Sequence, residues 1–131
     1  MSRENVEVVR RTIEIGVRDV DAWLGFYDPE VEWLPTPQSL PAGRSYRGHE
    51  GVRRFWEDLF STWEEYEVEA EEFQDLGDQG IVTGRVRARS ARGVDLIETW
   101  SALFTVRAGK IIRFQGFADR TGALGAARRG G

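Results

Sequence analysis

Strict alternation between charged and apolar residues in the second half of the chain constrains the fold most. Apolar side chains at every second position put one face of a strand in the core and the other in water. One such run is acidic and the next is basic, so neighbouring strands can pair through opposite charges. The two runs alternate Glu65, Glu67, Glu69 and Glu71 with Tyr66, Val68 and Ala70, then Arg85, Arg87 and Arg89 with Val82, Val86 and Ala88.

Turn residues between these runs predict a long antiparallel meander over residues 64–116. A turn at 77–79 that pairs Leu76 with Gly80 would set Glu71, Glu69 and Glu67 opposite Arg85, Arg87 and Arg89. Opposite charges across a strand pair contribute about 0.2–1 kcal/mol each. A three-residue turn at 91–93 would place Gly84 opposite Trp100, where the missing side chain leaves room for the indole. Residues 107–110 have the form of a type I turn with a glycine bulge.

The first half of the chain has helical periodicity instead. Ser2 can cap a helix with Val6, Val9, Ile13 and Val17 on one face, and Asp19 can cap a second helix with Val20, Trp23, Leu24 and Tyr27. Asp28 and Pro29 end that helix, residues 31–34 form a short strand, and residues 35–46 form a loop. Gly48 opens a third helix, whose apolar stripe comprises Val52, Phe55, Trp56, Leu59, Phe60 and Trp63.

Helices followed by an antiparallel sheet are the order of an α+β protein. We predict three N-terminal helices on the apolar face of a strongly curved sheet, a cone-shaped barrel with an internal pocket. Asp119 could cap a last helical turn over residues 121–127. The 131 residues suit one domain spanning 1–131, with residues 128–131 frayed at the end.

Composition excludes several classes of site. The chain has no cysteine and one histidine, which rules out cysteine-ligated metals and a multi-histidine centre, so we expect neither metal nor cofactor. A net charge of −4 argues against nucleic acid as a partner. No apolar run reaches membrane-spanning length, and the first residues do not form a signal peptide. We therefore expect a cytoplasmic protein that does not associate with membranes.

Two short segments carry a resemblance to a known family. Residues 46–52 (YRGHEGV) and 106–114 (VRAGKIIRF), within the order helix, helix, DPEVEW, helix, sheet, resemble the SnoaL-like branch of the nuclear transport factor 2-like superfamily. The resemblance spans essentially the whole chain and implies the cone-shaped fold. The superfamily includes isomerases, polyketide cyclases, dehydratases, hydrolases and members without chemistry, so function must be argued from the site.

The comparison with ketosteroid isomerases can be made residue by residue. The oxyanion-donating tyrosine of that family falls at Thr12, its general base at Trp33 and its protonated acid at Ala102. All three groups are missing, so we expect no ketosteroid isomerisation by that mechanism. The histidine–aspartate pair of SnoaL cyclases also has no match, because His49 lies in a different segment.

Glu98 is the main catalytic candidate. It shares strand parity with Trp100 and Phe104, and a carboxylate among apolar groups could serve as a general acid or base. Alternatively it lies near the strand end, held by water or by the Tyr27 or Tyr46 hydroxyl. His49, at the start of the third helix, could face a pocket mouth or complete a helix cap. The predicted lining comprises Tyr27, Trp33, Trp56, Val82, Val86, Trp100, Phe104 and Phe114.

Three functions remain open from the sequence. The first is a cofactor-independent isomerase, cyclase or hydrolase acting on a small hydrophobic, cyclic or polyketide-like molecule. The second is a non-catalytic module that binds such a molecule; an isolated Glu98 would favour it, and a second buried polar group beside Glu98 would favour the enzyme. The third is an interaction domain. We also expect a homodimer through the outer sheet face, whose predicted residues are Ile97, Thr99, Leu103, Thr105 and Ile111.

Overall fold

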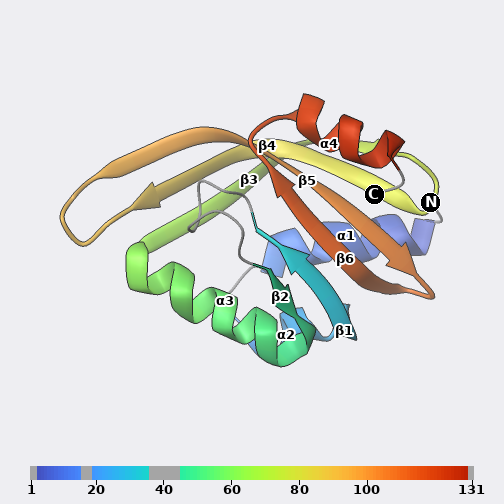
Figure 1. Cartoon of the computed structure of the whole chain (residues 1–131), viewed down its shortest axis with the longest axis horizontal. Coiled ribbons are helices and arrows are strands. Elements are labelled where there is room, and N and C mark those ends of the chain that lie inside the picture. The colour runs from blue at the N-terminus through green and yellow to red at the C-terminus, as the bar shows by residue number, and fades with distance from the viewer. Residues whose placement is uncertain (1–2, 16–18, 36–44, 130–131) are drawn as a thin grey trace.

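A computed structural model describes residues 3–15, 19–35 and 45–129 and confirms the α+β class (Figure 1). Two helices, two strands and a third helix are followed by four consecutive strands and a final helix. Within those ranges the elements are α1 (Arg3–Ile15), α2 (Val20–Leu24), β1 (Tyr27–Leu34), β2 (Tyr46–Arg47), α3 (Gly48–Thr62), β3 (Glu65–Asp75), β4 (Gln79–Arg89), β5 (Asp95–Arg107), β6 (Lys110–Phe117) and α4 (Arg120–Arg128).

The strands form one sheet in the order β2-β1-β6-β5-β4-β3. The pairing of β1 with β6 is parallel, and all other neighbours are antiparallel. This order leaves β2 and β3 as the edges of the predicted sheet. The hairpin of β4 and β5 extends past α3 as a long arm (Figure 1).

Two of the predicted helix caps are confirmed. The Asp19 carboxylate accepts from the Ala22 amide at 3.1 Å, and that of Asp119 accepts from the Gly122 amide at 3.0 Å. Because a side-chain acceptor satisfies an otherwise orphaned amide, each residue defines where its helix begins. The predictions for Ser2, Val17 and most of the loop at 35–46 lie outside the described residues.

The boundary between α2 and β1 was predicted wrongly. The helix ends at Leu24 and the strand already begins at Tyr27, so the Asp-Pro pair at 28 and 29 lies inside β1. Pro29 lies in the stretch between Tyr27 and Glu32 where the register with β6 shifts, and a proline can be accommodated at such an irregularity. Tyr27 nevertheless packs on Trp23, with ring centroids 4.4 Å apart, so both rings reach the same interior.

The register of β3 and β4 differs from the predicted one by two residues. Glu65, Glu67 and Glu69 pair with Arg89, Arg87 and Arg85. The amide of Leu76 donates to the carbonyl of Gln79, which shortens the turn by one residue, and a bulge between Ala70 and Glu72 shifts the strand by another. Since two single shifts preserve parity, acids still face arginines over residues 65–70.

Gly84 lies opposite Trp100 as predicted, but for a different reason. A Cβ atom built on Gly84 would lie 1.8 Å from the carbonyl oxygen of Glu69 on the neighbouring strand. The glycine therefore makes room for the backbone at the bulge rather than for the indole.

The turn between β5 and β6 was also predicted wrongly. Arg107 pairs with Lys110, and the two residues between them, Ala108 and Gly109, have φ of 52° and 77°. Positive φ at both central residues is the type I′ geometry, whose twist matches that of the flanking strands. The register shift that we expected at the turn occurs instead between Thr105 and Val106.

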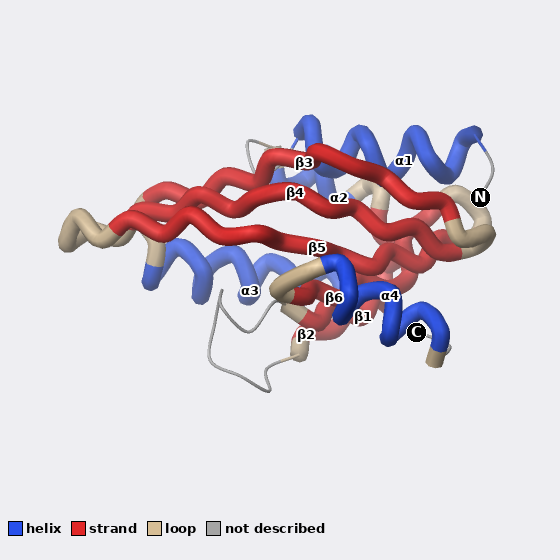
Figure 2. The backbone as a smooth tube through the Cα atoms, turned by 90° about the horizontal axis from the view of Figure 1, so that it is seen from above, coloured by secondary structure: helices blue, strands red, loops and turns tan. Residues whose placement is uncertain are grey.

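α4 covers part of the outer face of the sheet (Figure 2), where only one helical turn was expected. Ala123 and Ala126 pack there against Ile81 and Leu103. Leu103 is therefore buried under α4, and Ile111 lies in the main core, so neither belongs to an exposed outer patch. The predicted apolar face is smaller than expected, because strand parity alone cannot reveal that a terminal helix folds back over it.

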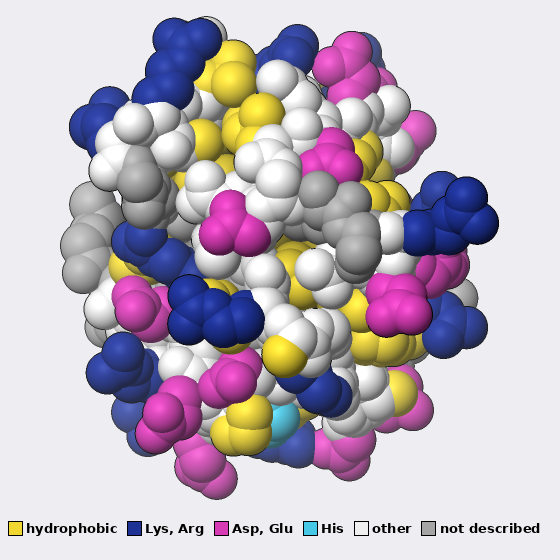
Figure 3. All heavy atoms as spheres, turned by 90° about the vertical axis from the view of Figure 1, so that its right-hand side faces the viewer, with side chains coloured by type: hydrophobic (Ala, Val, Ile, Leu, Met, Phe, Trp, Pro, Cys, Tyr) yellow, Lys and Arg dark blue, Asp and Glu magenta, His cyan; other side chains and the backbone are white. Residues whose placement is uncertain are grey.

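The main core lies between the other face of the sheet and α1, α2 and α3. Within the described ranges, no helix is both long enough and apolar enough to span a membrane. On the face seen in Figure 3, acidic and basic side chains are interspersed, so this face has no extended basic surface.

We predict that Gly84→Ala lowers the free energy of unfolding by about 3 kcal/mol or more, because the new methyl group meets backbone that cannot yield. Gly125→Ala is the matched control: its Cβ would meet only the flexible Arg129 side chain, and alanine favours the helix by about 0.5–1 kcal/mol. Urea unfolding followed by circular dichroism measures both. Equal effects of the two substitutions would contradict the proposed role of the bulge.

The homodimer stays a prediction, restricted to the part of the outer face that α4 leaves open. There Ile97 is 59% exposed and Thr99 is exposed. Sedimentation equilibrium at micromolar concentration should give twice the chain mass of 14.9 kDa, and Ile97→Lys should shift the equilibrium toward the monomer. A wild-type protein that sediments only as a monomer would rule the dimer out.

Candidate ligand-binding site

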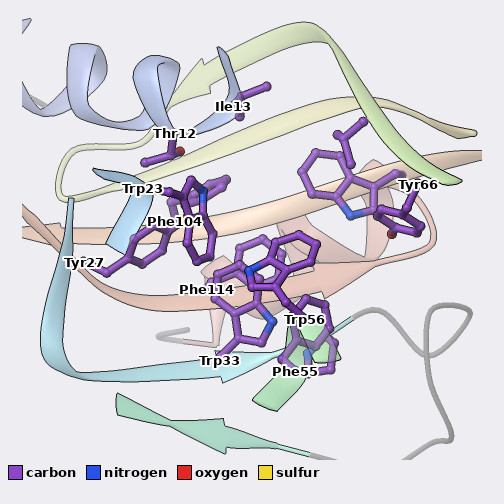
Figure 4. A pocket seen from close by; sticks show the side chains of 13 residues that line it. Thr12, Ile13, Trp23, Tyr27, Trp33, Phe55, Trp56, Tyr66, Phe104 and Phe114 are labelled. Carbon is purple, nitrogen blue, oxygen red and sulfur yellow. The ribbon is translucent and has the colours of Figure 1, made fainter. Parts of the chain in front are cut away.

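A cavity of about 120 Å³ lies between the helices and the inner face of the sheet (Figure 4). Nearly all of its wall is aromatic or aliphatic, and every described element except β2, β4 and α4 contributes to it. The lining residues are Thr12 and Ile13 from α1, Trp23 from α2, Tyr27 and Trp33 from β1 with Pro35 just after it, Phe55 and Trp56 from α3, Tyr66 and Val68 from β3, Trp100 and Phe104 from β5, and Phe114 from β6.

Local structure accounts for how these side chains converge. Trp100 and Phe104 are separated by an even number of strand positions and so share the inner face of β5. Phe55 and Trp56 are adjacent on α3, with ring centroids 4.9 Å apart, and together they cover a wide stripe of that helix. The half-buried members of the lining, such as Ile13 and Val68, mark the side on which the cavity approaches the surface.

Trp33 lies in the middle of this aromatic wall. Its indole stacks on Phe114, with centroids 3.9 Å apart and planes inclined by 13°. Edge-on contacts with Trp23 at 5.4 Å and a tilted contact with Phe55 at 5.2 Å hold it from the helical side. The ring is 4% exposed, so neighbouring rings fix its orientation.

The hydroxyls of Thr12 and Tyr27 form one polar part of the wall. The Thr12 hydroxyl donates to the carbonyl of Val9 at 2.7 Å, and the side chains of Thr12 and Tyr27 are hydrogen-bonded to each other. Burial raises the pKa of Tyr27 well above its ordinary value, and the bond to Thr12 offsets part of that rise. The phenol is therefore neutral at physiological pH and can act as a hydrogen-bond donor but not as a base.

Two indole N–H groups in the wall are unpartnered. Within the described part of the chain, Nε1 of Trp33 and Nε1 of Trp56 are buried and make no hydrogen bond. The same is true of Nε1 of Trp63, whose side chain does not line the cavity. A buried donor without a partner costs about 1–3 kcal/mol.

The two predicted catalytic residues lie away from the cavity wall. Glu98 is half-buried on β5 opposite Val86, two positions before Trp100, and it is not part of the lining. His49 is also half-buried, and its Nε2 lies 2.8 Å from the carbonyl oxygen of Tyr27. That contact ties the start of α3 to β1. The catalytic roles of Glu98 and His49 stay predictions.

Most of the predicted ligand-binding residues converge on the cavity. Val82 and Val86 are the exceptions: both are buried in the main core without reaching the wall. The residues that do line it are Tyr27, Trp33, Trp56, Trp100, Phe104 and Phe114.

Other lining residues were not among the predicted ones. Tyr66 and Val68 could have been found from their inward parity on β3. Thr12, Trp23 and Phe55 could not, because their contribution depends on how the helices cross the sheet.

The three ketosteroid isomerase positions separate in the structure. Thr12 and Trp33 both line the cavity, whereas Ala102 is fully buried outside the lining. Among the described residues there is no cluster of three or more side chains that could hold a metal ion.

Comparison with known proteins shows which family the chain belongs to. The family model of the SnoaL-like domain matches residues 9–114, most of the chain. The chain belongs to the SnoaL-like domain family. The predicted resemblance is thereby confirmed. No curated protein matches the sequence.

Solved structures place this SnoaL-like chain among nuclear transport factor 2-like proteins. TerC, co-crystallised with polyporic acid, is 25% identical with a TM-score of 0.80, covering 94% of this chain and 96% of its own. A nuclear transport factor 2-like protein from Burkholderia thailandensis is 26% identical with a TM-score of 0.78, covering 98% of each chain. A protein of a Jannaschia species, proposed to be a SnoaL-like polyketide cyclase, is 23% identical with a TM-score of 0.76, covering 96% of this chain and 94% of its own. The last likeness is one of fold alone.

Tyr27 should make the stability of the SnoaL-like domain sensitive to high pH. Its pKa is raised in the folded state, so the unfolded chain loses this proton first, above about pH 10. Folding stability is then fully present below about pH 10 and falls by about 1.4 kcal/mol per pH unit above it. Urea unfolding between pH 8 and 11.5 should show this decline. Tyr27→Phe should reduce this decline; an unchanged decline in Tyr27→Phe would contradict the assignment.

Proposed function

We propose that this SnoaL-like domain binds a small, neutral aromatic molecule in the cavity and holds it without acid–base chemistry. The observation that carries the proposal is the composition of the wall. Its 13 described residues include no carboxylate, imidazole, amine or guanidinium group. A general base must come within hydrogen-bonding reach of the proton that it removes, and this wall provides none.

Aromatic side chains determine the chemical class of the ligand. Trp33, Phe114 and Trp100 present ring faces and edges, and each favourable aromatic contact adds about 0.5–1.5 kcal/mol beyond the burial of apolar area. A charged ligand would lose its hydration in this cavity without gaining a counter-ion, so it is disfavoured. The indole N–H groups of Trp33 and Trp56 are donors without a partner, which favours a ring that carries an acceptor oxygen.

Catalysis remains the second candidate, through Glu98. Its position on the same strand face as Trp100 favours this reading. Its place outside the lining and opposite Val86 favours the binding module. Co-crystallisation of TerC with polyporic acid supports the proposal that this fold holds an organic ligand.

The five tryptophans allow a direct test by ¹H–¹⁵N NMR. We expect a panel of neutral aromatics, from toluene and p-cresol through naphthalene to anthracene, to include at least one saturable ligand. That ligand should shift the indole signals of Trp23, Trp33, Trp56 and Trp100, because all four line the cavity, and leave that of Trp63 unchanged. Trp63 thus serves as an internal control.

Glu98→Gln separates the two candidate functions. Because Glu98 is not part of the wall, the variant should bind the same ligand with the wild-type dissociation constant. If no panel member shifts the four signals, the binding proposal fails. If the bound ligand is chemically converted and Glu98→Gln abolishes the conversion, the catalytic reading replaces it.

A further inference from the structure

The volume of the cavity limits what it can hold. At about 120 Å³ it is smaller than the apolar cavity of about 150 Å³ that is known to take up benzene, and far below the roughly 300–1,000 Å³ of pockets for drug-sized ligands. There is room for one six-membered ring and a small substituent. A fused bicyclic or larger polyketide-like molecule exceeds this enclosed space and would have to extend beyond it.

Trp33 is the residue that sets this limit. It occupies the position that the ketosteroid isomerase comparison assigns to a general base, and there the largest side chain replaces a small carboxylate. Its indole forms part of the cavity wall, stacked on Phe114 at 3.9 Å and flanked by Trp23 at 5.4 Å. Contacts on its face and its edge hold the ring in this orientation.

We infer that the natural ligand is a single-ring aromatic compound and that Trp33 is the specificity-determining residue that excludes larger ring systems. This inference rests on the proposed binding function. The inference goes beyond that function, because it attributes the upper limit on the ligand's size to one side chain. Trp33 differs from other rings of the wall, such as Phe104, because it packs at once on Trp23 of α2, Phe55 of α3 and Phe114 of β6.

The wild-type protein supplies the first arm of the test. Toluene and p-cresol should give saturable shifts of the four cavity indole signals, whereas naphthalene and anthracene should give none at their solubility limits. Saturable binding of naphthalene at the same four signals would overturn the size limit while leaving the proposed function intact. Absence of binding by every compound would instead overturn the proposed function, so the two failures are distinguishable.

Substitution of Trp33 supplies the second arm. Trp33→Ala should admit naphthalene with at least about tenfold higher affinity than the wild type, and should bind toluene more weakly because ring contacts are lost. Trp33→Leu, which leaves a smaller void, should show the same change to a lesser degree and guards against a failure of Trp33→Ala to fold. The matched control is Trp63→Ala, which removes a half-buried indole outside the cavity and should leave ligand selection unchanged. Naphthalene affinity that is unchanged in a folded Trp33 variant, or raised equally by Trp63→Ala, would overturn the role of Trp33.

Discussion

The stacking of Trp33 on Phe114 is the contact on which the rest of the structure depends. The two residues face each other across the parallel pairing of β1 and β6, which joins positions 81 residues apart, since 114 − 33 = 81. Closing so long a connection costs chain entropy, and a large buried aromatic pair provides compensating burial where it is needed. The pair also links α2 and α3 to the sheet, because Trp23 and Phe55 pack on the same indole. Trp33 therefore stabilises the pairing of β1 with β6 and also lines the cavity.

Strand alternation predicted the faces of the sheet better than its register. The two errors on β3, a turn shorter by one residue and a bulge near Glu71, cancel in parity over residues 65–70. Beyond the bulge they do not cancel, and this brings Phe73 opposite Val82. Single-residue bulges depend on backbone fit, as the close approach of Gly84 to Glu69 shows, and side-chain periodicity contains no signal for them.

The candidate site was predictable to the extent that it depends on strand parity. Trp33, Trp100 and Phe114 were expected to line a pocket and do so. Glu98 has the same parity as Trp100, yet parity says nothing about where along a strand the helical cover ends. At about 3.4 Å per residue, Glu98 lies roughly 7 Å farther along β5 than Trp100, toward the arm. That Thr12 and Trp23 line the cavity could not be predicted, because it depends on how α1 and α2 lie on the sheet. Amphipathic periodicity shows which face of a helix is apolar but not where the helix packs.

The indole at position 33, where the ketosteroid isomerase comparison would place a general base, affects the chemistry of its neighbours as well. A carboxylate at position 33 would have required partners to offset its desolvation, whereas an indole there strengthens the apolar surroundings and so raises the cost of ionising any neighbour. The raised pKa of Tyr27 is an expression of these surroundings: its phenol can donate a hydrogen bond but cannot accept a proton from substrate near neutrality. Because every donor in the described wall is neutral, recognition there depends on shape and on weak polar contacts rather than on charge. Selectivity in such a site follows from the volume that the lining side chains leave, and Trp33 is among the largest of those side chains.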